Sequence, residues 1–151
     1  MVPTANIDWV WTMNRKFPSD MVQGHEAIEE LMQALEESAW EGRDLFHVRT
    51  AVEEGVVNAV EHGNMRNLDK FVRLDFRVSP SLCYIQITDE GQGFCRAELK
   101  DCTDDEFVDK PRGRGVHLIE QLMSETSYNE RGNQLTMLRK RHDPKLAIAE
   151  E

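Results

Sequence analysis

The chain has 151 residues, of which 40% are hydrophobic and 30% are charged. This length and balance are typical of one globular domain with a packed core, and they exclude a disordered or fibrous chain. The formal net charge of −10 makes direct binding to nucleic acid unfavourable, because the summed field repels a phosphate backbone. No run of about 18 apolar residues and no leader pattern is present, which predicts a cytoplasmic protein that does not bind membranes.

A strand and a helix are predicted first along the chain. Apolar residues alternate over residues 7–13, as in a half-buried strand, and Pro18 is expected to interrupt this pattern. Ser19 and Asp20 provide the residue types that begin helices, and apolar residues then recur at helical spacing as far as Trp40.

A second helix is predicted from Asp44 to His62, where apolar residues recur every three or four positions. A rotation of about 100° per residue places Glu54, Asn58 and Glu61 together on the side opposite this apolar stripe. This side is a candidate for chemistry.

Two alternating strands follow over residues 72–78 and 83–87, joined by turn residues as in a hairpin. Residues 95–112 have no clear periodicity and carry many acidic side chains, which indicates a mobile surface segment that acts as a lid.

The C-terminal part predicts a third helix that opens at residues 113–115, then short strands over 127–129 and 135–138. The basic residues at 139–141 are interpreted as a solvated strand end. We expect one domain over residues 1–141. Residues 142–151 are expected to form a flexible tail.

Asp89 follows directly after the second hairpin strand, with Gly91 and Gly93 next to it. A carboxylate at a strand end accepts a hydrogen bond, and the glycines allow the backbone to approach a flat ligand closely. The same string is also compatible with a plain tight turn.

Glu54 and Asn58 stand one helical turn apart. An Asn oxygen is a hard ligand that suits Mg²⁺, and a carboxylate one turn earlier can orient or deprotonate a hydroxyl group. The alternative for such a pair is an ordinary solvated helix face.

Gly113 and Gly115 lie where a helix is predicted to begin. Backbone N–H groups at a helix N-terminus are unsatisfied and favour an anion such as phosphate. A flexible turn is the alternative interpretation.

Three strings occur in this order: Glu-x-x-x-Asn-Ala-x-x-His-Gly, Asp-x-Gly-x-Gly-Phe and Gly-Arg-Gly-x-x-Leu-Ile. Together they resemble the ATPase superfamily of gyrase, histidine kinases and mismatch-repair ATPases, and within it the anti-sigma-factor serine kinases. The resemblance extends over about Phe17 to Lys140 and implies a Bergerat-type fold. That fold is an α/β (α+β) two-layer sandwich, with a mixed, mostly antiparallel sheet and about three helices on one face.

The resemblance also implies a role for each matching residue. Glu54 corresponds to the general base, Asn58 to the Mg²⁺ ligand, and Asp89 to the acid that recognises the adenine of ATP. The remaining positions implied to bind nucleotide are Gly91, Gly93, Gly113, Arg114, Gly115 and Thr136, of which Arg114 is also expected to offset charge during catalysis.

The expected activity is ATP-dependent phosphorylation of a serine or threonine on a small antagonist protein, combined with binding of a sigma factor. One alternative is a nucleotide-gated binding module without kinase activity. Another alternative is a self-contained ATP hydrolase. Larger relatives have this activity, but they need additional domains for it. A homodimer is expected from the resemblance, with the strand from Trp9 to Met13 as a candidate edge, although the same strand suits a core without a partner.

Overall fold

A computed structural model describes residues 7–91 and 111–148, with the backbone alone for residues 111–116 and 147–148. The strands are β1 (Trp11–Pro18), β2 (Phe71–Val78), β3 (Leu82–Thr88), β4 (Glu125–Tyr128) and β5 (Gln134–Lys140), and the helices are α1 (Met21–Glu37), α2 (Gly42–Val57), the π-helix η1 (Asn58–Gly63), α4 (Pro111–Leu122) and α5 (Pro144–Ile148). In the described chain the sheet has the order β1-β2-β3-β5-β4, and every neighbouring pair is antiparallel.

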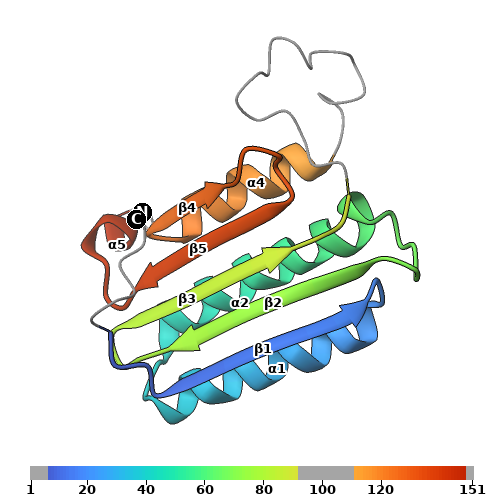
Figure 1. The fold of residues 1–151 in the computed structure, drawn as a ribbon. Helices are drawn as coiled ribbons and strands as arrows, with labels where there is room; N and C mark the ends of the chain where they lie inside the picture. The colour runs from blue at the N-terminus through green and yellow to red at the C-terminus, as the bar shows by residue number, and fades with distance from the viewer. Residues whose placement is uncertain (1–6, 92–110, 149–151) are drawn as a thin grey trace.

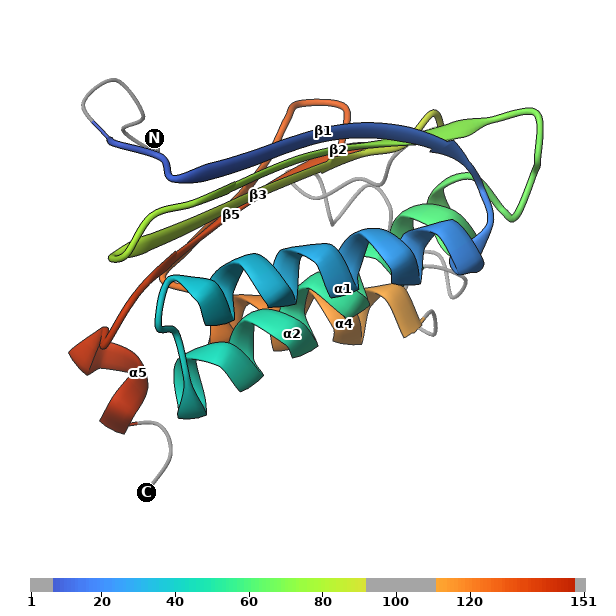
Figure 2. The ribbon, with the colours of Figure 1, turned by 90° about the horizontal axis from the view of Figure 1, so that it is seen from below.

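Helices α1, α2 and α4 cover one face of this sheet (Figures 1 and 2). The predicted two-layer α+β sandwich with about three helices on one face is therefore confirmed. Over the described strands the sheet is wholly antiparallel rather than mixed. No helix in the described ranges has the length and apolarity needed to cross a membrane.

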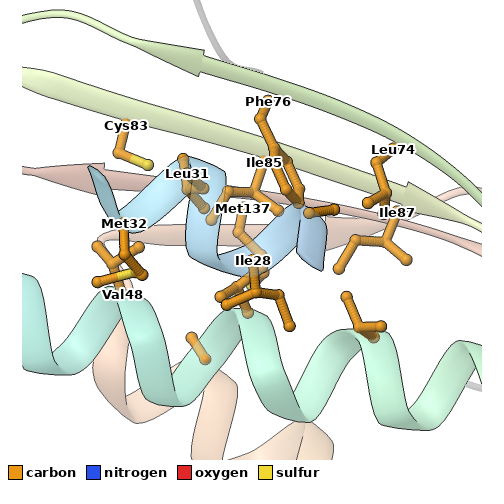
Figure 3. Packing of buried hydrophobic residues seen from close by; sticks show 14 of the residues in the cluster. Ile28, Leu31, Met32, Val48, Leu74, Phe76, Cys83, Ile85, Ile87 and Met137 are labelled. Carbon is orange, nitrogen blue, oxygen red and sulfur yellow. The ribbon is translucent and has the colours of Figure 1, made fainter. Parts of the chain in front are cut away.

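The hydrophobic core lies between the helices and the covered face of the sheet. Ile28 and Leu31 from α1 and Val48 from α2 lie opposite Phe76 of β2 and Ile85 of β3 (Figure 3), and all five are fully buried. Apolar residues recur every three to four positions on the helices and at alternate positions on the strands, so each element buries one face.

Strand β1 lies further along the chain than the alternation over residues 7–13 predicts. It begins at Trp11 and continues through Pro18, which pairs with Phe71. A proline is tolerated at this place because β1 is an edge strand and Pro18 is its last residue. The strand ends at Pro18, as the sequence predicts, although it starts later and extends further than the alternation over residues 7–13.

Helix α1 begins as predicted, with the Asp20 carboxylate accepting a hydrogen bond from Val22 N–H at 2.9 Å. It ends at Glu37, three residues before Trp40. Ala39 adopts a left-handed φ of 69°, and Trp40 then turns into the core, where its Nε1 donates to the Ser79 carbonyl at 2.9 Å.

Helix α2 begins two residues earlier than predicted and remains α-helical only to Val57. The next six residues, 58–63, form a π-helix, which widens the last turn. Glu61 is paired with Arg66 at 3.2 Å, whereas Asn58 is buried. The predicted common polar side of Glu54, Asn58 and Glu61 therefore does not extend through the π-helical turn.

The C-terminal elements are longer than the sequence predicts. Helix α4 already begins at Pro111, and a short helix, α5, follows the last strand. Leu146 of α5 is buried, so the chain still packs on the domain at this residue. The domain boundary placed at residue 141 stays a prediction.

Arg139 is buried, which corrects its interpretation as part of a solvated strand end. Only 1% of the residue is exposed, and its guanidinium group donates to the Asp44 carboxylate and to the Leu122 carbonyl, the latter at 2.7 Å. It also contacts His47 Nδ1 at 2.8 Å. Arg139 thus joins β5 to α2 and to the end of α4.

Candidate functional site

The end of α2, the end of β3 and the turn between β4 and β5 meet at one end of the molecule (Figure 1). Residues of these segments line a cavity. It is lined by Gly55, Asn58, Ala59, Asp89, Tyr128, Gly132, Asn133 and Leu135. The structure therefore brings together two of the predicted site residues, Asn58 and Asp89, from segments about 30 positions apart in the chain.

Helix α2 packs very closely on the sheet beside this cavity. A Cβ atom at Gly55 would lie 2.8 Å from Ile87 Cδ1 and 3.4 Å from Leu135 Cδ2. A separation of 2.8 Å is shorter than real Cβ contacts, so a side chain at Gly55 would require the end of Ile87 to shift. The glycine thus favours close packing of α2 on the sheet one turn before Asn58.

Asp89 is fixed by hydrogen bonds at the end of β3. Its Oδ1 accepts from Gly91 N–H at 2.8 Å. Its own N–H donates to the Asn133 carbonyl at 2.9 Å, and its carbonyl accepts from Asn133 Nδ2 at 2.7 Å. With 7% of the residue exposed, Asp89 presents a preorganised acceptor at the wall of the cavity.

Gly91 occupies a place that no other residue fits. A Cβ there would overlap the carbonyl group of Gly63. The Gly91 carbonyl accepts a hydrogen bond from Arg131 at 2.9 Å, which ties this turn to the loop between β4 and β5. Gly93 and the segment 92–110, which includes most of the predicted lid, lie outside the described residues.

Asn58 is the first residue of η1 and is 9% exposed. Its Nδ2 is buried and has no hydrogen-bond partner among the residues that the structure describes. A buried polar atom without a partner costs on the order of 1–3 kcal/mol, so its presence in a cavity fits a site that a polar ligand completes.

Glu54 lies four residues before Asn58 on α2, and the Asn58 N–H donates to the Glu54 carbonyl. The Glu54 side chain is partly exposed and does not line the cavity wall. The neighbouring Glu53 has a different environment, since it pairs with Arg49 at 3.4 Å.

Gly113, Arg114 and Gly115 lie inside the first turns of α4, because the helix begins at Pro111. Proline is favoured in the first turn, where its missing N–H is not needed. Helix α4 packs against α2 and contacts η1, so its N-terminal part belongs to the same region of the molecule as Asn58. The side chains at these three positions are not among those the structure describes.

Thr136 does not reach the cavity. It lies on β5 between Leu135 and Met137, which both belong to the core on the helix side of the sheet. Neighbouring residues on a strand face opposite ways, so Thr136 lies on the other face, where Gln86 Nε2 donates to its hydroxyl at 3.3 Å.

The chain was compared with known proteins. A family model described as the histidine kinase-like ATPase domain matches residues 17–139. The chain belongs to this family.

Two similar proteins of the histidine kinase-like ATPase class have informative names. A serine-protein kinase RsbW from Staphylococcus epidermidis is 34% identical over 104 residues, a match that covers 64% of this chain and 65% of that protein. An anti-sigma F factor from Bacillus subtilis (strain 168) is 28% identical over 100 residues, covering 64% of this chain and 67% of that protein. The chain thus matches just under two thirds of the length of the first relative.

A solved structure shares the fold. The crystal structure of the RsbU and RsbW domains of Rv1364c from Mycobacterium tuberculosis superposes with a TM-score of 0.56 and 16% sequence identity. The match covers 87% of this chain and 32% of that protein. It supports the architecture of the histidine kinase-like ATPase domain described above.

Asn133 is the residue of this ATPase domain that the sequence analysis missed. Besides bonding the backbone of Asp89, its N–H donates to Asn129 Oδ1 at 3.0 Å, and its Oδ1 accepts from Asn129 Nδ2 at 2.8 Å. Asn133 lies between the strands predicted over 127–129 and 135–138, and no role was predicted for it. The signal available was an amide side chain in a loop between two strands, because loops commonly carry binding residues.

Proposed function

We propose that the protein binds Mg-ATP in the cavity beside η1 and transfers the γ-phosphoryl group to a serine or threonine of a small antagonist protein. The observation that carries this proposal is the meeting at one cavity wall of Asp89 and Asn58, whose buried Nδ2 has no hydrogen-bond partner in the described chain. The family match supports nucleotide binding, and a relative named a serine-protein kinase supports the class of reaction.

Asp89 recognises the adenine base in this proposal. Its carboxylate accepts a hydrogen bond from the exocyclic amino group of adenine. Asn133 holds the backbone of Asp89 and Gly91 N–H holds its carboxylate before ATP arrives, so little ordering entropy is lost on binding.

Asn58 is the residue that would hold Mg²⁺. Its side-chain oxygen is a ligand of the kind the ion prefers. When bound there, the ion would offset negative charge on the phosphates.

Glu54 orients the incoming hydroxyl group and takes its proton. A bond forms between the hydroxyl oxygen and the γ-phosphorus while the bond from that phosphorus to the β,γ-bridging oxygen breaks, and ADP leaves. The N–H groups of Gly113 and Gly115 and the guanidinium of Arg114 are proposed to bind the phosphates and to offset the charge that develops on the transferred group.

A sigma factor is the proposed second partner. One relative is named an anti-sigma F factor and another a serine-protein kinase. We propose that this chain combines both properties, so that it binds a sigma factor in one state and phosphorylates the antagonist protein in another. We also propose a homodimer that pairs through β1, and a cytoplasmic location.

The deciding experiment follows labelled γ-phosphate from Mg-ATP to purified antagonist proteins of the same organism. Glu54→Ala is expected to retain ATP binding and to lose transfer by a factor of 10² or more, in line with removal of a general base. Glu53→Ala is the matched control, because Glu53 is the preceding residue and pairs with Arg49 instead.

The outcomes separate the proposals. Label on a partner serine or threonine that depends on Glu54 establishes the kinase. Tight, Asp89-dependent ATP binding without any label contradicts the kinase proposal and leaves the nucleotide-gated binding module as the explanation.

A further inference from the structure

The π-helix η1 ends directly against the loop that carries Asp89. A Cβ atom at Gly63, its last residue, would overlap the carboxylate of Asp89, and a Cβ at Gly91 would overlap the Gly63 carbonyl. Two backbone segments and one carboxylate are therefore packed with no space for a further methyl group. Any change at Gly63 acts first on the position of the Asp89 carboxylate.

Asn64 follows η1 and is 1% exposed. Its Oδ1 accepts from Glu90 N–H at 2.8 Å, while its Nδ2 donates to Ser19 Oγ at 3.0 Å and to the Phe71 carbonyl at 2.9 Å. Three bonds fix the orientation of this amide. Asn64 thus anchors the residue after Asp89 to the start of α1 and to β2.

The chain leaves η1 in an uncommon conformation. Asn64 N–H donates to the Ala59 carbonyl at 2.9 Å, and Arg66 N–H to the Val60 carbonyl at 2.8 Å. Met65 and Arg66 adopt left-handed φ values of 55° and 58°. Each such residue costs about 1 kcal/mol or more when it has a side chain, and strain of this kind persists where the surroundings over-determine it.

These observations describe one arrangement. The π-helical turn places Gly63 against the Asp89 carboxylate, and the Asn64 side chain binds the backbone of Glu90, the residue that follows Asp89. We propose that Gly63 and Asn64 are positioning residues that act through Asp89 and set the preference of the cavity for adenine over other bases. The proposal rests on the ATP-binding function proposed above. In addition to the Asp89 carboxylate itself, the end of η1 and the residue after it then determine the base preference.

The test measures ATP and GTP affinities of the full chain by titration calorimetry, with weak binding measured by competition against ATP. In Gly63→Ala we expect the ratio of ATP to GTP affinity to fall at least tenfold, because the added methyl group displaces the carboxylate. A residue with only a structural role lowers both affinities together and leaves this ratio unchanged.

Asn64→Ala provides a second variant should Gly63→Ala fail to fold. It is expected to lower the same ratio by releasing Glu90 N–H. Asn67→Ala is the matched control, because Asn67 lies in the same loop and its Oδ1 accepts from Asp69 N–H at 2.9 Å, whereas Asn64 Oδ1 accepts from Glu90 N–H. The control is expected to keep the wild-type ratio.

A double-mutant cycle tests whether the effect passes through Asp89. In an Asp89→Asn background, Gly63→Ala is expected to change ATP affinity by less than threefold, since the group it displaces no longer discriminates. Additive losses, or an unchanged ATP-to-GTP ratio in both single variants, overturn the positioning role. A wild-type protein that binds both nucleotides equally contradicts adenine recognition by Asp89, whereas one that binds neither contradicts the proposed ATP-binding function itself.

Discussion

Asp89 combines burial with a fixed carboxylate, an arrangement that selects one type of hydrogen-bonding group on a ligand. Its Oδ1 is held by Gly91 N–H at 2.8 Å, and its backbone is bonded to Asn133 in both directions. The carboxylate therefore has little freedom to turn away from the cavity. A buried acceptor of this kind favours a ligand that presents a donor, because two facing acceptors remain unsatisfied.

Replacement of Asp89 by Asn tests this selection. We expect Asp89→Asn to weaken ATP binding by about ten- to a hundredfold, since hydrogen bonds to charged groups contribute about 1.5–3 kcal/mol. The amide keeps an oxygen for Gly91 N–H but offers a donor to the cavity. Glu90→Gln is the control, because Glu90 is the next residue and is exposed. Titration calorimetry that finds equal affinity for wild type and Asp89→Asn contradicts the site assignment.

Cys83 is fully buried in the core (Figure 3). Burial raises the pKa of its thiol well above that of an exposed cysteine. The reactive thiolate is therefore scarce, and we expect native protein to resist alkylation by iodoacetamide at Cys83 even at pH 9. Tandem mass spectrometry locates the label, and protein unfolded in urea is the control. Equally fast labelling in both states would show that Cys83 is accessible in the folded chain.

The position of Thr136 could have been inferred from its neighbours. Leu135 and Met137 are the apolar residues expected in the core, and strict alternation then places Thr136 on the opposite face. Asn133 was harder to identify, because its role depends on a contact with Asp89, 44 positions away. Motif spacing predicted Asn58 and Asp89 because each sits at the end of a regular element. Turn residues lack such a pattern.

Three elements meet at the buried pair of Asp44 and Arg139. Their side chains are 7% and 1% exposed. The Asp44 carboxylate also accepts from His142 N–H at 3.1 Å, and Arg139 bonds the carbonyl of Leu122 at the end of α4. The charges of Asp44 and Arg139 compensate each other, so removal of one partner leaves the other charge buried without compensation.

Asp44→Asn is expected to lower the free energy of unfolding by about 3–5 kcal/mol, the usual cost of breaking a buried ion pair. Glu30→Gln is the comparison, because it removes an ion pair with Arg15 whose side chains are 50% and 33% exposed. That surface pair is expected to contribute less than about 1 kcal/mol. Urea unfolding curves measure both. Similar losses for the two variants would contradict a special role for the buried pair.

Regular alternation made β2 and β3 predictable to within one residue at each end, since their inward residues are uniformly apolar. The ends of the helices were less predictable. A left-handed residue at Ala39 ends α1 before Trp40, and a π-helical turn replaces the last part of α2. Both depend on tertiary packing, which a hydrophobic period does not encode. The burial of Arg139 was missed for the same reason.

At the scale of the whole molecule the two edges of the sheet differ. Strand β4 has four residues, whereas β1 has eight and, in the described chain, pairs only with β2 (Figure 1). Short edge strands resist further pairing, and long ones offer a row of backbone groups to a second chain. The proposed homodimer therefore uses β1, with the exposed Val10 beside its first residue.

Val10→Lys tests this dimer by placing a charge at the start of the edge strand. Sedimentation equilibrium of the wild type is expected to give twice the mass of one chain, and Val10→Lys is expected to raise the dimer dissociation constant at least tenfold. Val22→Lys is the matched control, since Val22 is 64% exposed and Val10 60%, but Val22 lies on α1. The control should remain dimeric. A monomeric wild type excludes the dimer, and equal weakening by both variants excludes β1 as its contact.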